Sequence, residues 1–99
     1  MNDGEFVAYV DQLQNEIWRN KIRRGFNTVI VGKELVLMME EMGEVARAFR
    51  DENPEQVLAE IGDLLIYSLG LCKLLGGNAG ELILRTQRAN ETRTHRSKL

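Results

Sequence analysis

The chain has 99 residues, a formal net charge of −2 and a single cysteine. This length predicts one domain, residues 1–99, which buries only about 60 to 65% of its unfolded surface, so association with further copies would stabilise it. The lone Cys72 excludes an internal disulfide, and no stretch combines dense basic residues with interleaved aromatic residues, which argues against nucleic-acid binding.

The sequence also bears on location. The N-terminal residues MNDGEFVAYVDQ are acidic where a secretory leader would be basic. The longest apolar stretch, from Leu64 to Leu75, holds twelve residues including Lys73, whereas a membrane span takes roughly 20. We therefore expect a cytoplasmic protein with no membrane contact.

Two helices are predicted in the first half of the chain. The first runs from about Gly4 to Ile22 and ends where Gly25 to Thr28 break the pattern. The second covers roughly Lys33 to Asp51, and Thr28 to Val31, the one β-branched run, predicts a short extended lead-in to it. The apolar stripe of the first helix is Phe6, Val10, Leu13 and Ile17, and that of the second is Met38, Met42, Val45 and Phe49.

The third helix is expected from Pro54 to about Leu75. Asn53 before a proline is typical of an N-cap followed by proline at the first helical position, and Gly76-Gly77 ends the segment. This helix is apolar on nearly every side, so we expect it to be buried at the centre of an oligomer. Its apolar residues include Val57, Leu58, Ile61, Leu64, Leu65, Ile66, Leu69, Leu71, Leu74 and Leu75.

A fourth helix is expected from about Ala79 to Arg93. Asn78 and Glu81, three residues apart, resemble a capping box at its start. His95 follows in a polar tail, where an exposed side chain is expected rather than a ligand. No segment reads convincingly as a sheet, so the predicted fold class is all-α, a four-helix chain that forms an oligomeric helical bundle.

Two short acidic motifs stand on neighbouring predicted helices. Glu41-Met42-Gly43-Glu44 is followed, after fifteen residues, by Glu60-Ile61-Gly62-Asp63. Residues three apart share a helix face, so a helical hairpin can bring all four carboxylates together. Such a cluster needs a cation, most of all Asp63 in its apolar surroundings. Oxygen ligands select hard ions such as Mg²⁺ or Mn²⁺, which most often serve phosphate chemistry.

Acidic and basic residues are segregated along the chain. Residues 33–63 carry nine acids against three bases, residues 17–32 carry four bases and no acid, and residues 85–99 carry five bases against one acid. This layout favours a polyanionic substrate held through a metal, with the flanking bases on its phosphates.

At these motifs the sequence resembles the MazG-like all-α nucleoside triphosphate pyrophosphohydrolases. Their hallmark is E-x-x-E, a linker and E-x-x-D, matched here by EEMGEVARAFRDENPEQVLAEIGDLLIY at residues 40–67. The resemblance spans about residues 13–93. It implies a helical hairpin that dimerises into a four-helix bundle, often with dimers paired into tetramers. It also implies hydrolysis of (deoxy)nucleoside triphosphates to monophosphate and pyrophosphate, as in house-cleaning of the nucleotide pool.

The resemblance further implies roles for individual residues. Tyr67, four residues after the motif's aspartate, occupies a position that contacts the nucleotide in relatives. A basic residue followed by N-x-x-R is matched by Arg85, Asn90 and Arg93, with arginine at position 85 in place of the more usual lysine. The implied ligands of Mg²⁺, for which Mn²⁺ would substitute, are Glu41, Glu44, Glu60 and Asp63.

The expected chemistry assigns the remaining candidates. A divalent ion between the carboxylates and the phosphates would offset their repulsion, and water would be the nucleophile. Glu40 and Glu44 are candidate general bases by proximity. Trp18 or Tyr67 would stack on the base. The side chains expected to neutralise phosphate oxygens are Lys33, Arg85 and Arg93.

Three alternatives remain. Phosphoribosyl-ATP pyrophosphohydrolase has a similar fold and motif, but it commonly carries a histidine after the Asp-Leu-Leu-Tyr segment, where this chain has Ser68. A non-catalytic helical dimerisation module would use the acids as surface charge only. A metal-dependent phosphohydrolase of another bond preference would differ in its products. The sequence identifies neither base nor sugar.

Overall fold

The computed structural model describes residues 1–93, which contain four α-helices and no strand. The helices are α1 (Asp3–Arg24), α2 (Val31–Arg50), α3 (Pro54–Leu74) and α4 (Ala79–Thr92). The predicted all-α class with four helices is confirmed, and His95 lies outside the described residues. Within residues 1–93, no helix combines the length and the apolar character needed to cross a membrane.

Asparagine caps begin three of the helices. The side chains of Asn2, Asn53 and Asn78 each accept a hydrogen bond from a backbone N–H three residues on, at 2.9, 3.1 and 3.0 Å. Such a cap satisfies one of the backbone donors that the first turn of a helix leaves free. The caps expected at Asn53 and Asn78 are therefore confirmed.

The start of α2 differs from the expectation. An extended lead-in was expected through Val31, but Val31 is already the first helical residue, and extended backbone is found at the N-cap, Ile30. The side chain of Asn27 explains the early start, because its Oδ1 accepts hydrogen bonds from the backbone N–H groups of Val29 (3.2 Å) and Ile30 (3.0 Å). These bonds close the turn, and the helix begins directly after it.

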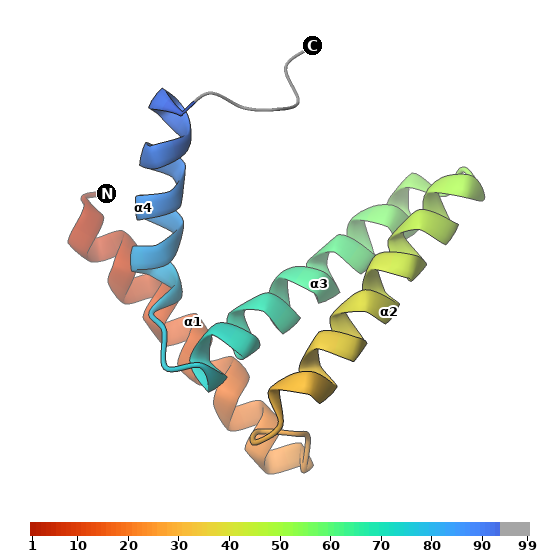
Figure 1. The fold of residues 1–99 in the computed structure, drawn as a ribbon, viewed down its shortest axis with the longest axis horizontal. Coiled ribbons are helices and arrows are strands. Elements are labelled where there is room, and N and C mark those ends of the chain that lie inside the picture. Colours follow the sequence, from red (N-terminus) through yellow and green to blue (C-terminus); the bar gives the residue numbers. More distant parts are fainter. Residues whose placement is uncertain (94–99) are drawn as a thin grey trace.

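The chain forms two arms that meet near the middle of α1 (Figure 1). The hairpin arm consists of α2 and α3, which pack along each other, and the α1–α4 arm consists of α1 and α4. The C-terminal part of α3 packs on α1, whereas α4 makes no close backbone approach to α2. This open shape gives a radius of gyration of 15.4 Å, against about 13 Å for a compact domain of 100 residues.

Gln14 joins the arms. Its side chain, in a residue only 1% exposed, donates hydrogen bonds to the carbonyls of Leu69 (3.2 Å) and Gly77 (3.3 Å) and accepts one from the N–H of Ala79 (3.2 Å). One buried amide thus connects α1 with the end of α3 and the start of α4.

Close helix contact also fixes the α1–α4 arm. A Cβ atom at Gly80 would lie 2.9 Å from Val7 Cα, inside the contact distance of two carbon atoms. Glycine is therefore required for α4 to cross α1 at this separation.

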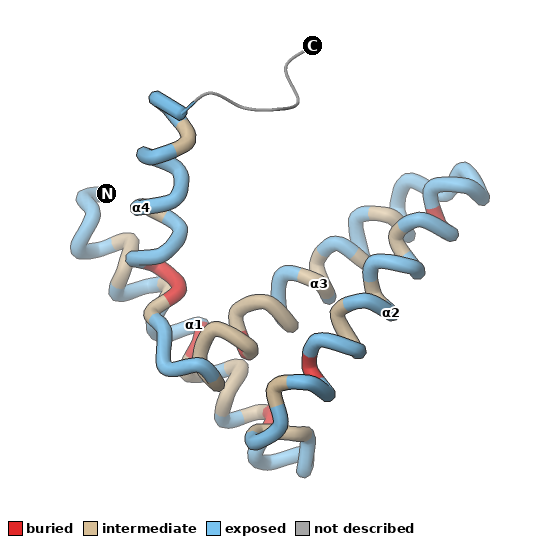
Figure 2. The backbone as a smooth tube through the Cα atoms, in the orientation of Figure 1, coloured by how far each residue is buried: buried red, intermediate tan, exposed pale blue. Residues whose placement is uncertain are grey.

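The single chain has a small core (Figure 2). Among the described residues, Ala48 and Ala79 are the buried hydrophobic ones, while Met39, Leu58 and Leu65 on the hairpin arm are 74, 70 and 60% exposed. In α3, Gly70 is the buried residue, so the helix expected at the centre of an assembly is largely open in one chain. Its burial in an oligomer stays a prediction.

Candidate metal and nucleotide site

Carboxylates from both helices of the hairpin arm converge. Glu41 on α2 and Glu60 and Asp63 on α3 each offer one oxygen, and these three oxygens lie within 4.8 Å of one another. Glu41 and Glu60 are half-buried, and Asp63 is exposed. The antiparallel packing of α2 on α3 thus brings together three of the four carboxylates that the motifs single out.

Glu44, the fourth carboxylate, lies beside this cluster. Its side chain is exposed, and the adjacent carboxyl of Glu60 raises its pKa above the ordinary range, through contact and through charge. Glu44 therefore contributes negative charge at the edge of the cluster, one helical turn beyond Glu41.

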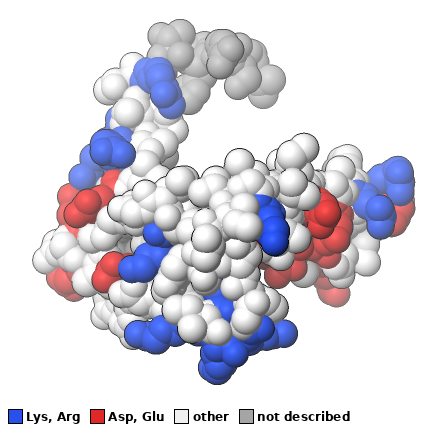
Figure 3. All heavy atoms as spheres, turned by 60° about the horizontal axis from the view of Figure 1, so that its bottom comes forward, with Lys and Arg blue, Asp and Glu red and all other residues white. Residues whose placement is uncertain are grey.

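The cluster perturbs its own ionisation. The pKa of Glu41 is raised to about 7, first by burial, then by the adjacent Glu60 carboxyl, and then by the charges of Glu44 and Asp63. The pKa of Glu60 is lowered, chiefly because Gln56 donates a hydrogen bond of 2.5 Å to Glu60 Oε1. Acidic side chains gather on the hairpin arm in Figure 3, and they repel one another there when no cation is present.

Two oxygens of the cluster are buried without a hydrogen-bond donor. Glu41 Oε2 and Glu60 Oε2 have no partner among residues 1–93. A buried, unpartnered polar atom costs about 1 to 3 kcal/mol, and more when it is charged. A hard divalent cation would satisfy both oxygens, and carboxylate oxygens are the ligands that Mg²⁺ and Mn²⁺ prefer. The residues present therefore fit such an ion.

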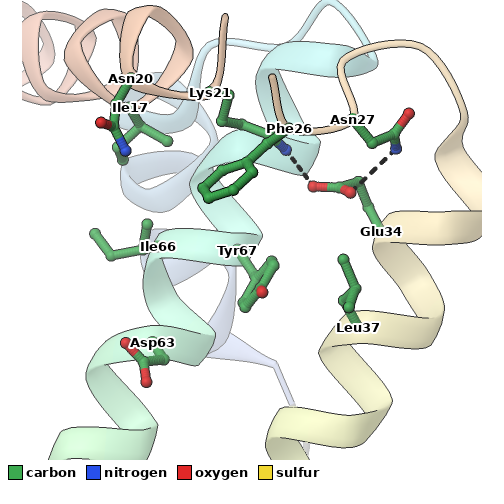
Figure 4. Close-up of a pocket in the computed structure, with 10 residues that line it drawn as sticks. All are labelled: Ile17, Asn20, Lys21, Phe26, Asn27, Glu34, Leu37, Asp63, Ile66 and Tyr67. Carbon is green, nitrogen blue, oxygen red and sulfur yellow. Dashed lines mark hydrogen bonds and ion pairs between the residues drawn. The ribbon is translucent and has the colours of Figure 1, made fainter. Parts of the chain in front are cut away.

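A cavity of about 480 Å³ lies next to the cluster, between α1 and the hairpin arm (Figure 4). Asp63 belongs to both, so the cavity opens onto the carboxylates. This volume is within the range of small-molecule sites. The rings of Phe26 and Tyr67 point into it, and the Arg24 guanidinium lies 4.7 Å from the Phe26 ring centroid. The lining residues are Ile17, Asn20, Lys21, Phe26, Asn27, Glu34, Leu37, Asp63, Ile66 and Tyr67.

A buried ion pair lies at the end of this cavity away from Asp63 (Figure 4). Lys21 Nζ donates to Glu34 Oε1, and these residues are 8% and 1% exposed. Asn27 Nδ2 donates to the other oxygen, Glu34 Oε2, at 3.1 Å. The cavity therefore has a charged end formed by α1 and α2, opposite the end that the acidic cluster forms.

The other candidate residues lie outside the carboxylate cluster and the cavity. Trp18 on α1 is half-buried but does not line the cavity, and Lys33 and Glu40 are exposed on α2. The candidates on α4 lie on the other arm, away from the cluster, and Arg93 donates a hydrogen bond to Asn90 there. One chain thus unites the carboxylates and Tyr67, but it does not bring to them the α4 candidates Arg85, Asn90 and Arg93.

Six residues of the cavity were not singled out from the sequence, namely Asn20, Lys21, Phe26, Asn27, Glu34 and Leu37. A signal was present for two of them. Lys21 continues the apolar stripe of α1 four residues after Ile17, and Glu34 precedes Glu41 by two helical turns on the same face of α2. A lysine and a glutamate on inward faces of adjacent helices predict an internal pair. Phe26 and Asn27 stand in a turn, where periodicity gives no signal.

Comparison with known proteins yields one family match. The chain matches the model of the MazG nucleotide pyrophosphohydrolase domain over residues 33–91. No curated protein and no solved structure matches it significantly. The matched segment contains both acidic motifs and more than half of the chain, whereas Lys21, Phe26 and Asn27 precede it. The chain belongs to the MazG nucleotide pyrophosphohydrolase domain family.

Proposed function

We propose that this chain hydrolyses nucleoside or deoxynucleoside triphosphates between the α- and β-phosphates, in a reaction that depends on Mg²⁺. The products are the monophosphate and pyrophosphate. Family membership supports nucleotide pyrophosphohydrolysis as the reaction class. The single observation that carries the metal dependence is the pair of buried, unpartnered oxygens in the three-carboxylate cluster.

Glu41, Glu60 and Asp63 would hold the cation, with Glu44 adding charge beside them. A divalent ion bound there supplies positive charge against the phosphates and lowers the pKa of bound water. The four carboxylates otherwise repel a triphosphate, so substrate binding is expected to require the ion. Mn²⁺ should replace Mg²⁺, because both are bound through oxygen.

The cavity supports a position for the nucleoside. A base placed between α1 and the hairpin arm would lie against Phe26 and Tyr67, with its phosphates toward Asp63. Aromatic rings can stack on any nucleobase. Glu40 and Glu44 are exposed on α2, where either would accept the proton of the attacking water. Trp18, outside this cavity, has a weaker claim to base stacking than Tyr67.

A second copy of the chain would complete the site. Arg85 and Arg93 lie on the arm that does not reach the cluster of its own chain, so a role on the phosphates requires the α4 of a partner. The exposed apolar residues of the hairpin arm support such association in a homodimer or homotetramer. Lys33, exposed on α2, would act on the phosphates from the chain that holds the cation.

The test is a panel of ribo- and deoxyribonucleoside triphosphates, each incubated with the protein and Mg²⁺, with chromatography of the products. Monophosphate with pyrophosphate is expected, and chelation by EDTA should abolish both. Diphosphate with orthophosphate would overturn the assigned bond. Hydrolysis of phosphoribosyl-ATP in place of every triphosphate in the panel would favour the alternative, phosphoribosyl-ATP pyrophosphohydrolase.

A further inference from the structure

We propose that Glu34 selects nucleobases with an exocyclic amino group, namely cytosine, adenine and guanine, over uracil and thymine. Glu34 forms part of the charged end of the cavity, opposite the acidic cluster. This inference rests on the proposed function, because it assigns a substrate class to the same site. The residues of the charged end, Lys21, Asn27 and Glu34, lie on α1, the following turn and the start of α2 rather than in the acidic motifs.

The ion pair at this end of the cavity is too buried to be a surface contact. Lys21 is 8% and Glu34 1% exposed. Removing two charges from water costs about as much as their attraction returns, so apolar residues of similar volume would serve stability equally well. A buried pair that also lines a nucleotide-sized cavity is better explained by recognition of a ligand.

The hydrogen bonds from Lys21 and Asn27 do not use all the lone pairs of the Glu34 carboxylate. A carboxylate has about four lone-pair positions. Lys21 occupies one on Oε1, and Asn27 occupies one on Oε2 at 3.1 Å. The remaining capacity of Glu34 is for acceptance only. A base that enters the cavity would meet this carboxylate where Glu34 borders the cavity, beside the Lys21 ammonium.

Asn27 acts as a positioning residue. Its amide nitrogen also donates to Ile30 O (2.7 Å), and its oxygen accepts from the backbone N–H groups of Val29 and Ile30. Both ends of the amide are therefore occupied within the protein, and the side chain holds the Glu34 carboxylate in one orientation.

Nucleobases with an exocyclic amino group differ from uracil and thymine in the groups that they present to a carboxylate. Cytosine and adenine carry an amino group where thymine and uracil present the carbonyl oxygen O4, and guanine carries its amino group at C2, next to its ring N–H. Each of these amino groups can donate to a carboxylate. The one ring N–H of uracil is flanked by two carbonyls, so a carboxylate close enough to accept from it also approaches a carbonyl oxygen. A fixed carboxylate consequently favours the amino bases and disfavours uracil and thymine.

The dimensions of the site agree with this assignment. Glu34 precedes Glu41 by seven residues on α2, which corresponds to about 10.5 Å along the helix axis. A nucleoside that reaches Glu34 with the edge of its base would stack that base against Tyr67 and have its sugar toward Asp63, since both residues line the same cavity. The phosphates then reach the carboxylates of the cluster.

The experiment compares kcat/KM for the five triphosphates in the wild type and in Glu34→Gln. The wild type should prefer the amino bases by about tenfold or more. A glutamine amide donates as well as accepts, so it also matches the 4-carbonyl, and the preference should fall by about tenfold. The matched control, Glu16→Gln at an exposed position of α1, should keep the wild-type ratio. Equal wild-type rates for all five bases would overturn the inference.

Two further measurements separate this inference from the proposed reaction. Binding of CMP, AMP, GMP, UMP and TMP, followed by calorimetry, reports base preference without hydrolysis. Amino-base preference in binding with no hydrolysis would support the inference and refute the reaction, whereas hydrolysis without base preference would do the reverse. If Glu34→Gln fails to fold, the double variant Lys21→Met/Glu34→Met removes both charges, and it should bind all five monophosphates alike. A retained preference in that variant would refute the role of Glu34.

Discussion

The hairpin arm and the α1–α4 arm differ in how their buried polar atoms are satisfied. In the α1–α4 arm, the buried Gln14 uses both ends of its amide in hydrogen bonds to backbone groups. In the hairpin arm, Glu41 and Glu60 each keep one buried oxygen without a partner. Large apolar side chains are open in both arms, for example Leu58 and Leu65 on α3 and Tyr9 and Ile22 on α1.

This difference indicates which arm depends on other molecules. The α1–α4 arm completes its polar contacts within the chain, so it can act as a scaffold. The hairpin arm leaves carboxylates for a cation, while both arms leave apolar surface open to a second copy. Polar groups that a chain leaves buried and unsatisfied are expected where a ligand completes them.

The largest expected effect is the loss of activity in Asp63→Asn. The substitution keeps the size of the side chain but removes a charge from the cation site, and kcat/KM should fall by on the order of 1,000-fold. Thermal melts should show the metal-free variant to be at least as stable as the wild type, because one repelling charge is gone. Added Mg²⁺ should stabilise the wild type more.

The control for this variant is Asp51→Asn, at the exposed end of α2. It should keep both activity and the Mg²⁺ response. A fully active Asp63→Asn protein would remove the basis for the cation site, and a destabilised variant with an unchanged Mg²⁺ response would identify Asp63 as a structural residue.

The two arms should complement each other between copies. Asp63→Asn and the double variant Arg85→Ala/Arg93→Ala are each expected to be inactive. In a dimer whose sites combine one hairpin arm with the partner's α4, unfolding and refolding an equal mixture should restore about a quarter of wild-type activity. Steady-state hydrolysis rates of the mixture measure this.

The matched control mixes Asp63→Asn with Glu60→Gln, two variants of the same arm. Neither copy then supplies an intact cluster, so activity should stay absent. No recovery in the first mixture would refute the action of the α4 arginines on the partner's cluster.

Gln14→Leu tests the scaffold role of the α1–α4 arm. The substitution leaves the Ala79 N–H and two carbonyls without their partner, which should lower the free energy of unfolding by about 2 to 4 kcal/mol. Chemical denaturation measures the change. Gln12→Leu, at an exposed position of the same helix, is the control and should change stability little. Equal effects of both substitutions would refute the role of Gln14.

The smallest effect concerns pH. The pKa of Glu41 is raised to about 7 from an ordinary 4.5, so the folded state binds the proton more tightly than the unfolded state. Its contribution to stability is therefore fully present below pH 4.5 and is lost as pH rises through about 7. Thermal melts in EDTA should show this decline, and Glu41→Gln should flatten it.

The α1–α4 arm should respond to pH in the opposite direction. Arg88 donates a hydrogen bond of 2.8 Å to Asp3 and lowers its pKa below 3.8. That contribution is present above pH 3.8 and is lost as pH falls through the lowered pKa. Asp3→Asn should remove the acid-side loss only. A decline between pH 4.5 and 7 that persists in Glu41→Gln would contradict the assignment to Glu41.

The sequence was sufficient where local rules decide the outcome. Asn53 before Pro54 and Asn78 before α4 predicted two helix starts, because capping depends on neighbouring residues only. Spacing on one helix face likewise anticipated that Glu41 and Glu60 would meet across the hairpin.

The rest depends on contacts distant in the chain. Periodicity marks which face of α4 is polar, but it does not reveal that α4 packs on α1 away from the carboxylates. The same holds for Gln14, whose partners are 55 to 65 residues away. The start of α2 was placed two residues late, since the side chain of Asn27 closes the preceding turn.

The separation between the two arms depends on how closely α4 approaches α1 at Gly80. This glycine lies at the second residue of α4, where a methyl group would approach Val7 Cα to 2.9 Å. The fourteen residues of α4 form a helix about 21 Å long. A small tilt of the helix at Gly80 therefore produces a larger shift at its C-terminal end, where Asn90 and Arg93 lie. The absence of a side chain at Gly80 thus helps to set the distance between these residues and the carboxylates of the same chain.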